Sequence, residues 1–432
     1  EKYPKNYFQN PLDIPLELSG TFGELRSNHF HAGLDLKTQG KEGFKVFAVA
    51  DGYISRIKIQ QYGYGKTIYI THPNGYTSVY GHLSKFNTKI EAYVKRIQYK
   101  KENYETGNLF PKTDAFILKK GEIIAFSGDT GGSGGPHLHF EIRDTKSEHV
   151  INPLLFGINI PDSKSPTIQS LLVYPLSADA RINQQYNRHK ISIKNIGNGK
   201  YRSDRISASG TIGFGVNIFD RLDNSWNKNG IYSLEMLVNG KRHYYHDVST
   251  FSFAESKYLN LLIDYGYYKK YKRRIQKTFK EDKNELSIYK DLVNNGKINI
   301  KSGFNYTIEI IAKDIAGNTS AVKIPVKGEK SNAVFKKQKD TTAYKIIADK
   351  FQKFKKENIT IAFPKNTFYQ DIYLDFTVDS GVAKIHTPSI ALNKSYTLTF
   401  NVSKYTTQEK EQLYIANTEY AKYPRYVNTR KK

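Results

Sequence analysis

Residues Gly131–Ile142 read GGSGGPHLHFEI, a glycine-rich turn followed by a run in which histidines and apolar residues alternate. Successive side chains of a β-strand point to opposite faces, so residues two apart share a face. A strand here would bring His137 and His139 together on one face. The residues predicted to face a core on the other side are Leu138, Phe140 and Ile142. Two imidazoles on one strand face make a candidate metal or acid–base site.

A second alternating stretch runs from His29 to Leu36, HFHAGLDL, with apolar residues at every even position. As a strand it would place His29, His31 and Asp35 on one face, and Gly33 would leave space between the last two. A helical i,i+4 pairing of His31 with Asp35 is the alternative. Gly33 and the period of two favour the strand.

Residues 45–83 follow a pattern of strand, turn and strand. Four short β-prone runs are separated by Asp-Gly at 51–52, by Gly-Tyr-Gly at 63–65 and by Pro-Asn-Gly at 73–75. These are turn signals typical of antiparallel hairpins. His82 closes the fourth run.

Residues 85–119 break this pattern with a basic segment rich in Lys and Tyr. Ile90, Val94 and Ile97 have helical spacing, which predicts an insertion with one or two helical turns beside the cleft. The alternative is a solvent-exposed surface insertion without a role at the site. The segment 1–160, with this insertion, is predicted to be the first domain, because the proline-marked stretch 152–162 follows the last motif.

The rest of the chain is predicted to be β-rich as well. Residues 161–328 contain short strands split by turns, a spacing that fits a β-sandwich of the immunoglobulin-like type. Residues 329–432 are predicted to form a second β-rich module, with a helix around 343–355. Its few strands suggest a module cut short at Lys432. The predicted fold class is therefore mainly β: an antiparallel domain with a partly helical insertion, followed by β-sandwich modules.

The composition of the 432 residues limits the chemistry. The chain has 33 Tyr and 24 Phe but no Cys, which excludes disulfides, thiolate metal sites and cysteine nucleophiles. Its formal net charge of +25 predicts attraction to polyanions. The chain starts at Glu1 and has no apolar run of membrane-spanning length, so we expect a processed, exported protein whose signal peptide has been removed.

Seven of the eleven histidines lie in the first 150 residues. A catalytic zinc takes three N or O ligands and keeps one position open for water. His31, Asp35 and His139 can supply these ligands from two neighbouring strands, with His29 as the alternative first ligand. His137 and His82 are the candidates for moving the proton of the attacking water.

Three motifs carry a resemblance to a known family. His31-x-x-x-Asp35, Tyr80-Gly81-His82-Leu83 and Gly135-Pro136-His137-Leu138-His139 resemble the lysostaphin/LytM-type zinc endopeptidases that cut peptidoglycan peptides. The intervening GYGKTIYITHPNGYTSVYGHLS is similar in order and spacing, and the resemblance covers about residues 20–155. The overall plan looks like that of envelope peptidases of Gram-negative bacteria.

The resemblance implies a function for each motif residue. His31, Asp35 and His139 would bind zinc, and His82 and His137 would assist catalysis. It further implies a periplasmic or secreted metalloendopeptidase acting on stem or cross-bridge peptides of peptidoglycan. No nucleic acid is expected as a partner, whereas the trailing β-modules are expected to contact an envelope protein. The long 85–119 insertion departs from the family and leaves the substrate preference open.

Other polar residues have simpler interpretations. His72 ends a strand before a turn and is expected to be structural, and Asp129 and Asp144 are expected to be turn residues. Ser133 lies in a G-x-S-x-G pattern, but a serine-hydrolase elbow needs a following helix. The alternating stretch after Pro136 predicts a strand instead.

A rival hypothesis is a non-catalytic regulator of the same fold that binds and activates another wall hydrolase. Regulators of that kind resemble the family but have lost metal ligands. All the motif residues are present in this chain, which favours the enzyme.

Overall fold

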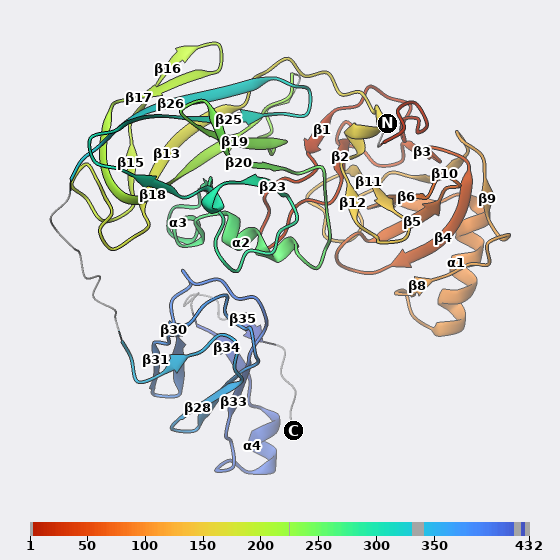
Figure 1. Cartoon of the computed structure of the whole chain (residues 1–432). Coiled ribbons are helices and arrows are strands. Elements are labelled where there is room, and N and C mark those ends of the chain that lie inside the picture. The colour runs from red at the N-terminus through yellow and green to blue at the C-terminus, as the bar shows by residue number, and fades with distance from the viewer. Residues whose placement is uncertain (1–2, 224, 331–340, 419–424, 428–432) are drawn as a thin grey trace. The chain divides into compact units, whose positions relative to one another are not determined.

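The computed structural model describes residues 3–223, 225–330, 341–418 and 425–427. It divides into two compact units, Glu1–Lys337 and Gln338–Lys432. Antiparallel strands dominate both units (Figure 1). Within the described residues, no helix combines the length and the apolar character that crossing a membrane requires.

The first sheet of the larger unit holds the alternating stretches of the sequence. Its path is β1-β2-β11-β6-β5-β4-β8, with three short strands attached at its margins. The strands of this sheet are β1 (Leu18–Gly20), β2 (Leu34–Lys37), β4 (Gly52–Ile59), β5 (Lys66–Thr71), β6 (Tyr76–Gly81), β8 (Gly107–Leu109), β9 (Ile117–Leu118), β11 (His137–Asp144), β12 (Val150–Ile151) and β21 (Thr250–Phe251). The small sheet beside it contains β3 (Lys45–Phe47), β10 (Ile123–Phe126) and β7 (Lys85–Phe86).

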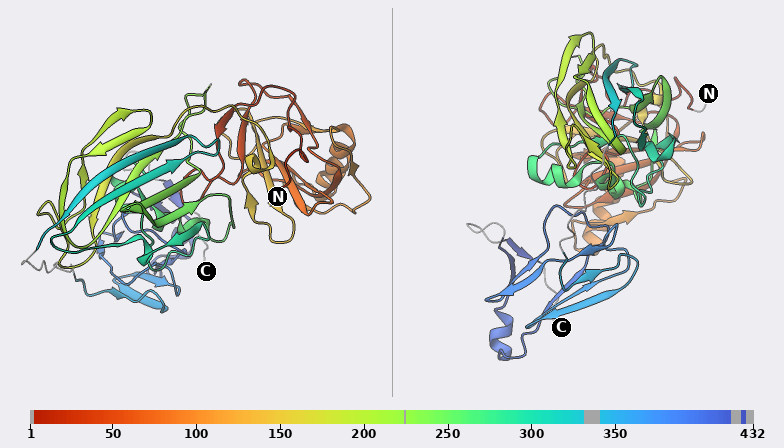
Figure 2. Two further views of the ribbon diagram at one scale, coloured as in Figure 1. Left: turned by 45° about the horizontal axis from the view of Figure 1, so that its top comes forward. Right: turned by 60° about the vertical axis from the view of Figure 1, so that its left-hand side comes forward.

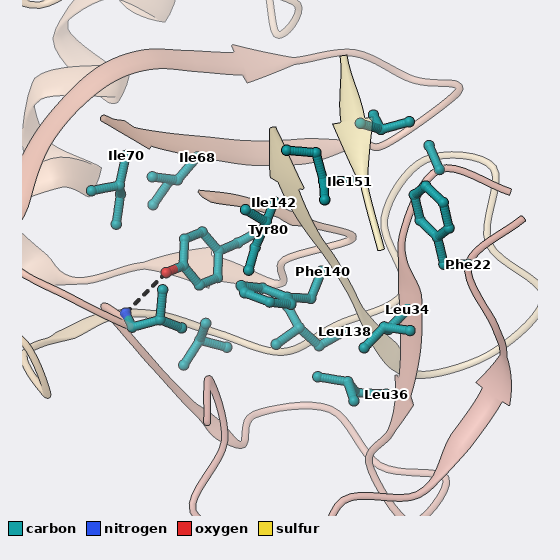
Figure 3. Packing of buried hydrophobic residues seen from close by; sticks show 14 of the residues in the cluster. Phe22, Leu34, Leu36, Ile68, Ile70, Tyr80, Leu138, Phe140, Ile142 and Ile151 are labelled. Carbon is teal, nitrogen blue, oxygen red and sulfur yellow. Dashed lines mark hydrogen bonds between the residues drawn. The ribbon is translucent and has the colours of Figure 1, made fainter. Parts of the chain in front are cut away.

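Strand β11 lies between β2 and β6 and is antiparallel to both. The predicted alternation is confirmed, because Leu138, Phe140 and Ile142 are completely buried in the core. Figure 3 shows these side chains packed around Tyr80, whose hydroxyl accepts a hydrogen bond from the backbone N–H of Val49 at 3.1 Å. Burial of one such side chain stabilises the fold by roughly 1.5–3 kcal/mol, so this face fixes the register of β11.

The predicted strand from His29 to Leu36 is wrong in its first half. Strand β2 begins only at Leu34, and His29 lies in a bend with its side chain exposed. Gly33 has a different use from the one predicted. A Cβ atom there would lie 2.4 Å from the carbonyl oxygen of Phe140, so glycine allows the two backbones to approach.

The 85–119 insertion is more ordered than one or two helical turns. Helix α1 (Thr88–Lys101) has 14 residues, and the Asn87 side chain caps its first turn by accepting a hydrogen bond from Ile90 N–H. Ile90 and Val94 are buried, as the spacing predicted. The segment after the helix forms β8 and β9, which pair with β4 at the far edge of the sheet from β2. The insertion therefore extends that edge.

The remainder of the larger unit is a second, connected sheet of 13 strands. Its path runs β15-β13-β18-β26-β25-β19-β20-β23, and Figure 2 shows these strands, green to cyan, wrapping around a common interior. The path strands are β13 (Thr167–Pro175), β15 (His189–Ile191), β18 (Ile206–Phe219), β19 (Ser233–Val238), β20 (Lys241–Asp247), β23 (Tyr289–Leu292), β25 (Asn305–Lys313) and β26 (Thr319–Gly328). The attached strands are β14 (Arg181–Ile182), β16 (Ile193–Gly197), β17 (Lys200–Ser203), β22 (Gln276–Lys277) and β24 (Ile298–Ile300).

The two halves of this sheet face each other across a core, as in a sandwich. Val216 of β18, Met236 of β19, Ile310 of β25 and Ile324 of β26 all belong to that core. Two short helices, α2 (Leu259–Leu262) and α3 (Tyr265–Tyr271), follow β21.

The first hydrophobic core is not confined to residues 1–160. Phe251 of β21 is completely buried, and its ring lies 5.0 Å from that of Phe22 and 5.1 Å from that of Phe30. Seven further side chains from this part of the chain join the same core: Leu222, Val248, Leu259, Leu262, Ile263, Leu286 and Ile288. The predicted division near residue 160 is therefore a boundary across which side chains pack together.

In its described residues, the smaller unit contains short antiparallel strands and one helix, α4 (Thr407–Glu411). The helix predicted around 343–355 is wrong, since the chain there forms strands β27 (Lys345–Ile346) and β28 (Gln352–Lys356). The other strands are β29 (Ile359–Phe363), β30 (Ile372–Tyr373), β31 (Phe376–Asp379), β32 (Val382–Ile385), β33 (Thr397–Phe400), β34 (Ile415–Asn417) and β35 (Arg425–Val427). Ile359, Ile361 and Phe363 alternate into its separate core.

Candidate metal centre

Three potential ligand atoms meet beside strand β11. Oδ1 of Asp35 lies 3.0 Å from Nε2 of His31 and 2.9 Å from Nδ1 of His139. The two imidazole nitrogens are 3.2 Å apart. All three side chains are buried, with 2–5% of their surface exposed. The structure thus brings together the three residues that the sequence predicted as a ligand set.

The backbone explains this convergence. Asp35 on β2 is directly opposite His139 on β11, and His139 is opposite Gly81 on β6. Facing residues in antiparallel strands have their Cβ atoms about 4.5–5.5 Å apart. His31 precedes β2 and comes from the connecting segment. The alternative first ligand, His29, is exposed and directs its Nδ1 toward the carbonyl oxygen of Ser27 at 2.7 Å.

The hydrogen bonds of the two histidines leave one nitrogen of each ring free to bind a metal ion. Nδ1 of His31 lies 2.8 Å from the carbonyl oxygen of Thr21, which can only accept, so this nitrogen carries the proton. Nε2 of His139 lies 2.9 Å from a carboxylate oxygen of Glu141. In the neutral rings, the lone pairs therefore lie on His31 Nε2 and His139 Nδ1, the atoms that meet Asp35.

Asp35 uses its two oxygens differently. Oδ1 faces the histidines, whereas Oδ2 accepts a hydrogen bond from Arg26 at 2.7 Å. Gly20 provides the space for this ion pair, because a Cβ atom there would lie 2.4 Å from the arginine nitrogen. Burial by itself would raise the pKa of Asp35, but His137, His139 and His31, which can donate to this carboxylate when they are protonated, hold that pKa far below its usual range. The carboxylate is thus ionised and oriented to present one oxygen.

Glu141 anchors a buried network behind His139. Its carboxylate accepts hydrogen bonds from His139, from the hydroxyl of Tyr64 and from Arg143, whose Nε is 2.6 Å away. Burial opposes ionisation, but the charge of Arg143 and these hydrogen bonds lower the pKa of Glu141 to about 2. For His139, hydrogen bonds with Asp35 and Glu141 outweigh burial and raise the pKa to about 9 in the metal-free site, so a metal ion that bound here would displace a proton from Nδ1. A ligating histidine that is oriented by a carboxylate is typical of metal sites.

His82 and His137 lie beside the three candidate ligands. Their ring centroids are 4.7 Å apart, and that of His82 is 5.9 Å from the ring of His139. Nδ1 of His82 lies 2.7 Å from the carbonyl oxygen of Thr130, and Nδ1 of His137 lies 2.8 Å from that of Gly135. Both neutral rings therefore have their lone pair on Nε2. Burial lowers the pKa of His82 to about 4.

His82 departs from the alternation of the strand before it, β6. It would share the face of Tyr80 if β6 continued, yet Tyr80 lies in the core and His82 lies beside the other histidines. The reason is its backbone: φ is +57°, in the left-handed region, directly after the strand ends at Gly81. This single residue turns the side chain back toward the site.

Four residues that support the site are not among the predicted site residues: Arg26, Tyr64, Glu141 and Arg143. Glu141 and Arg143 could have been predicted, because the period of two that pairs His137 with His139 continues to these residues. Arg26 and Tyr64 lie in loops and had no such signal.

The remaining polar candidates have structural partners. His72 is buried between the carbonyl oxygen of Asp51 and the hydroxyl of Ser78, each at 2.8 Å. Asp129 accepts a hydrogen bond from Gly135 N–H, and Asp144 from Ser147 N–H. Ser133 is followed by strand β11, so the helix of a serine-hydrolase elbow is not formed.

The donor set fits a tetrahedral transition-metal ion. Two neutral imidazoles and one carboxylate are common zinc ligands, and bonds of about 2.0–2.1 Å in a tetrahedron put ligand atoms about 3.3 Å apart. The observed separations of 2.9–3.2 Å are close to this value. His31, Asp35 and His139 thus form a group that can bind a metal ion.

Comparison with known proteins gives two family matches. Residues 29–99 match the model of Peptidase family M23, and residues 343–429 match that of the Zu5-like domain. The first match contains His31, Asp35 and His82.

Several curated relatives are similar to this chain. An uncharacterized metalloprotease of Haemophilus influenzae is 30% identical over 38% of this chain and 30% of its own length. The DD-carboxypeptidase/endopeptidase Mpg of Neisseria meningitidis is 30% identical over 36% of this chain and 29% of its own length. Lysostaphin of Staphylococcus simulans is 31% identical over 32% of this chain and 21% of its own length. The chain thus spans less than a third of the length of these relatives.

Among solved structures, the catalytic domain of lysostaphin from Staphylococcus simulans is 26% identical, with a TM-score of 0.24. The alignment covers 32% of this chain and 87% of that domain. The family match, the relatives named as metalloprotease and endopeptidase, and the group of histidines and aspartate agree with one another. Residues 29–99 of this chain are thus similar to Peptidase family M23.

Proposed function

We infer that the protein is a zinc-dependent endopeptidase that hydrolyses peptide cross-links of bacterial peptidoglycan. The observation that supports this most directly is the convergence of His31, Asp35 and His139, with two more histidines fixed beside them. A zinc ion held there would supply Lewis acidity to the scissile carbonyl and make water a nucleophile near neutral pH.

The proton-transfer roles fall to His82 and His137. Each ring donates from Nδ1 to a backbone carbonyl, which leaves its Nε2 as a proton acceptor on the side of the site. One ring would take the proton of the attacking water and return it to the leaving amine. The other, once protonated, would donate a hydrogen bond to the developing oxyanion.

The supporting residues hold the site in place while these protons move. Arg26 fixes the second oxygen of Asp35, and Glu141 fixes the ring of His139. Thr21 and Thr130 fix the tautomers of His31 and His82 through their carbonyl oxygens. Such preorganisation lets the site stabilise charge without rearranging.

The cellular setting follows from the substrate. We place the protein in the periplasm or outside the cell, where peptidoglycan is accessible. The formal net charge of +25 suits encounter with an anionic wall polymer. The β-rich parts that follow the peptidase domain are the surfaces expected to contact the wall or an envelope protein.

The test combines metal analysis with digestion of purified peptidoglycan. The expected result is one zinc per chain and new peptide products identified by mass. Asp35→Ala and His139→Ala should lose both zinc and activity, whereas His29→Ala, the exposed neighbour, should keep both. Zinc-loaded, folded protein that binds peptidoglycan and releases no products would instead support the regulator hypothesis.

A further inference from the structure

A second group of acidic residues lies in the 13-stranded part of the larger unit. Asp162 belongs to the segment before β13, Asp220 directly follows β18, and Asp314 directly follows β25. One carboxylate oxygen from each lies within 4.8 Å of the other two. The three residues are far apart in the sequence, so only the fold assembles them.

The charge of this acidic group is not compensated by an ion pair. Asp220 and Asp314 are only 3% and 2% exposed, and none of the three carboxylates has a salt bridge within the described part of the chain. The nearby ammonium group of Lys164 donates instead to the carbonyl oxygens of Leu222 and Asp223. Buried carboxylates without a counter-charge are costly.

Several buried oxygens here have no hydrogen-bond donor. Among the described residues, Oδ1 of Asp220, Oδ2 of Asp162 and Oδ1 of Asn229 are all unpartnered. Asn229 is 3% exposed, and its backbone exchanges two hydrogen bonds with Asp220, which places their side chains on the same side. Because buried polar atoms nearly always have a partner, three side chains with open oxygens at one place indicate a missing cation.

Asp314 is the member held most firmly. Its Oδ1 accepts hydrogen bonds from the backbone N–H groups of Gly317 and Asn318, and its Oδ2 accepts one from the Asn318 side chain. Asn318 also donates to the carbonyl oxygen of Asp162. The geometry of the group is therefore preformed.

We propose that Asp162, Asp220 and Asp314, with the side-chain oxygen of Asn229, bind a calcium ion. An all-oxygen donor set suits a hard cation, whereas zinc prefers nitrogen and sulfur. Mg²⁺ keeps several of its water molecules, and two of the three carboxylates here are buried. Ca²⁺ accepts six to eight oxygens in flexible geometry and is the better match.

The mutual repulsion of the carboxylates raises their pKa values. Burial and the neighbouring carboxylates raise the pKa of Asp220 to about 7 and that of Asp162 to about 6. Burial also raises the pKa of Asp314. A divalent cation would remove this repulsion.

The bound cation would fix the loop that starts at Asp220. Asn229 closes this loop, and the next residue, Gly230, donates a hydrogen bond from its N–H to the hydroxyl of Thr21 at 3.1 Å. Thr21 is also the residue whose carbonyl oxygen accepts from His31. Calcium at the acidic group would thus stabilise a segment that contacts Thr21, the residue that orients the candidate ligand His31.

The experiment measures calcium binding by the full chain in saturating zinc. Calorimetry and the melting temperature are recorded with Ca²⁺ and with Mg²⁺, for the wild type and for Asp220→Asn. The matched control is Asp204→Asn, an exposed carboxylate of the same unit that lies outside the acidic group. We expect one Ca²⁺ per chain and a rise in melting temperature of several degrees for the wild type and the control.

For Asp220→Asn we expect calcium binding to weaken by at least about tenfold, since ligand charge sets the affinity of such sites. Without calcium, this variant should melt higher than the wild type because one repelling charge is gone. If it does not fold, Asp162→Asn, the half-buried member, provides the same comparison. Unchanged melting of the wild type in millimolar Ca²⁺, undiminished binding by a folded variant, or an equal response to Mg²⁺ would overturn the proposal.

Discussion

Glu141 accepts a hydrogen bond at 2.9 Å from His139, two residues earlier on strand β11, while Arg143, two residues later, pairs with its other oxygen. One face of a single strand therefore carries a candidate ligand, the carboxylate that orients it and the cation that keeps this carboxylate ionised. The order of these three side chains follows from the two-residue period alone.

Glu141→Gln should lower zinc affinity by about 10–100-fold, the usual cost of losing an orienting partner of a metal ligand. The reason is that an amide no longer enforces the tautomer of His139. Zinc affinity is measured by competition with a chelator, and thermal melting is recorded in parallel.

Tyr64→Phe is the control, because it removes another hydrogen bond to Glu141 but leaves the carboxylate paired with Arg143 and available to His139. It should reduce stability by about 0.5–1.5 kcal/mol, the usual contribution of one hydrogen bond, with much less change in zinc affinity. Equal zinc affinities for the two variants would contradict the orienting role of Glu141.

His82→Asn should keep zinc and lose turnover by about 10²–10⁴-fold, the usual effect of removing an acid–base group. Asparagine is chosen because it tolerates the left-handed conformation at φ +57°. Zinc content, melting temperature and rate are measured on one preparation, with His29→Asn as the exposed control. Loss of zinc would make His82 a ligand, and normal turnover would exclude a catalytic role.

His246 gives a stability effect away from the metal centre. It is completely enclosed, its Nδ1 lies 2.8 Å from the hydroxyl of Tyr244, and burial lowers its pKa to about 4 from the ordinary 6.5. Between these values the unfolded chain binds a proton that the folded chain does not. The free energy of unfolding should therefore fall as the pH falls from about 6.5 to 4, by about 1.4 kcal/mol per pH unit for this group.

Urea unfolding at several pH values checks this expectation. His246→Gln should show a shallower loss of stability in that pH range, although it is less stable at pH 7 because a packed ring is gone. His29→Gln, an exposed substitution, should keep the slope of the wild type. An unchanged slope for His246→Gln would assign the acid sensitivity to other groups.

Truncation tests the packing of Phe251 against Phe22 and Phe30. A fragment of residues 1–160 lacks Phe251 and its neighbours, and losing one buried phenylalanine already costs about 3–5 kcal/mol. We expect this fragment to aggregate or melt without cooperativity, whereas a fragment of residues 1–330 should bind zinc like the whole chain. A monomeric, cooperatively melting 1–160 fragment with stoichiometric zinc would refute this expectation.

Much of the metal centre was readable from the sequence because alternation is a local signal. In His137–Ile142 each side chain is placed by its own position in a central strand with a fixed register. The same reasoning failed at His29, which lies in a bend before β2, and at His82, where one left-handed residue reverses the side on which the ring lies. Neither change alters the pattern of apolar and polar residues.

Other features depend on contacts between distant segments. The stretch 343–355 forms strands because Phe354 faces Ile361 of the neighbouring β29, a pairing that local propensity does not reveal. Arg26 reaches Asp35 from a loop, and the acidic group combines two strand ends with the segment before β13. Such features can be recognised only once the fold is known.

The shared core around Phe251 also bears on how this architecture can be inherited or engineered. A recombination event that exchanged residues 1–160 for those of another peptidase would remove Phe22 and Phe30 and leave Phe251 without its aromatic partners. Phe30 is the residue directly before His31. The catalytic part is therefore expected to pass between proteins together with the sandwich, as one unit of about 330 residues. The smaller unit, with its own core, is the piece that can be replaced independently.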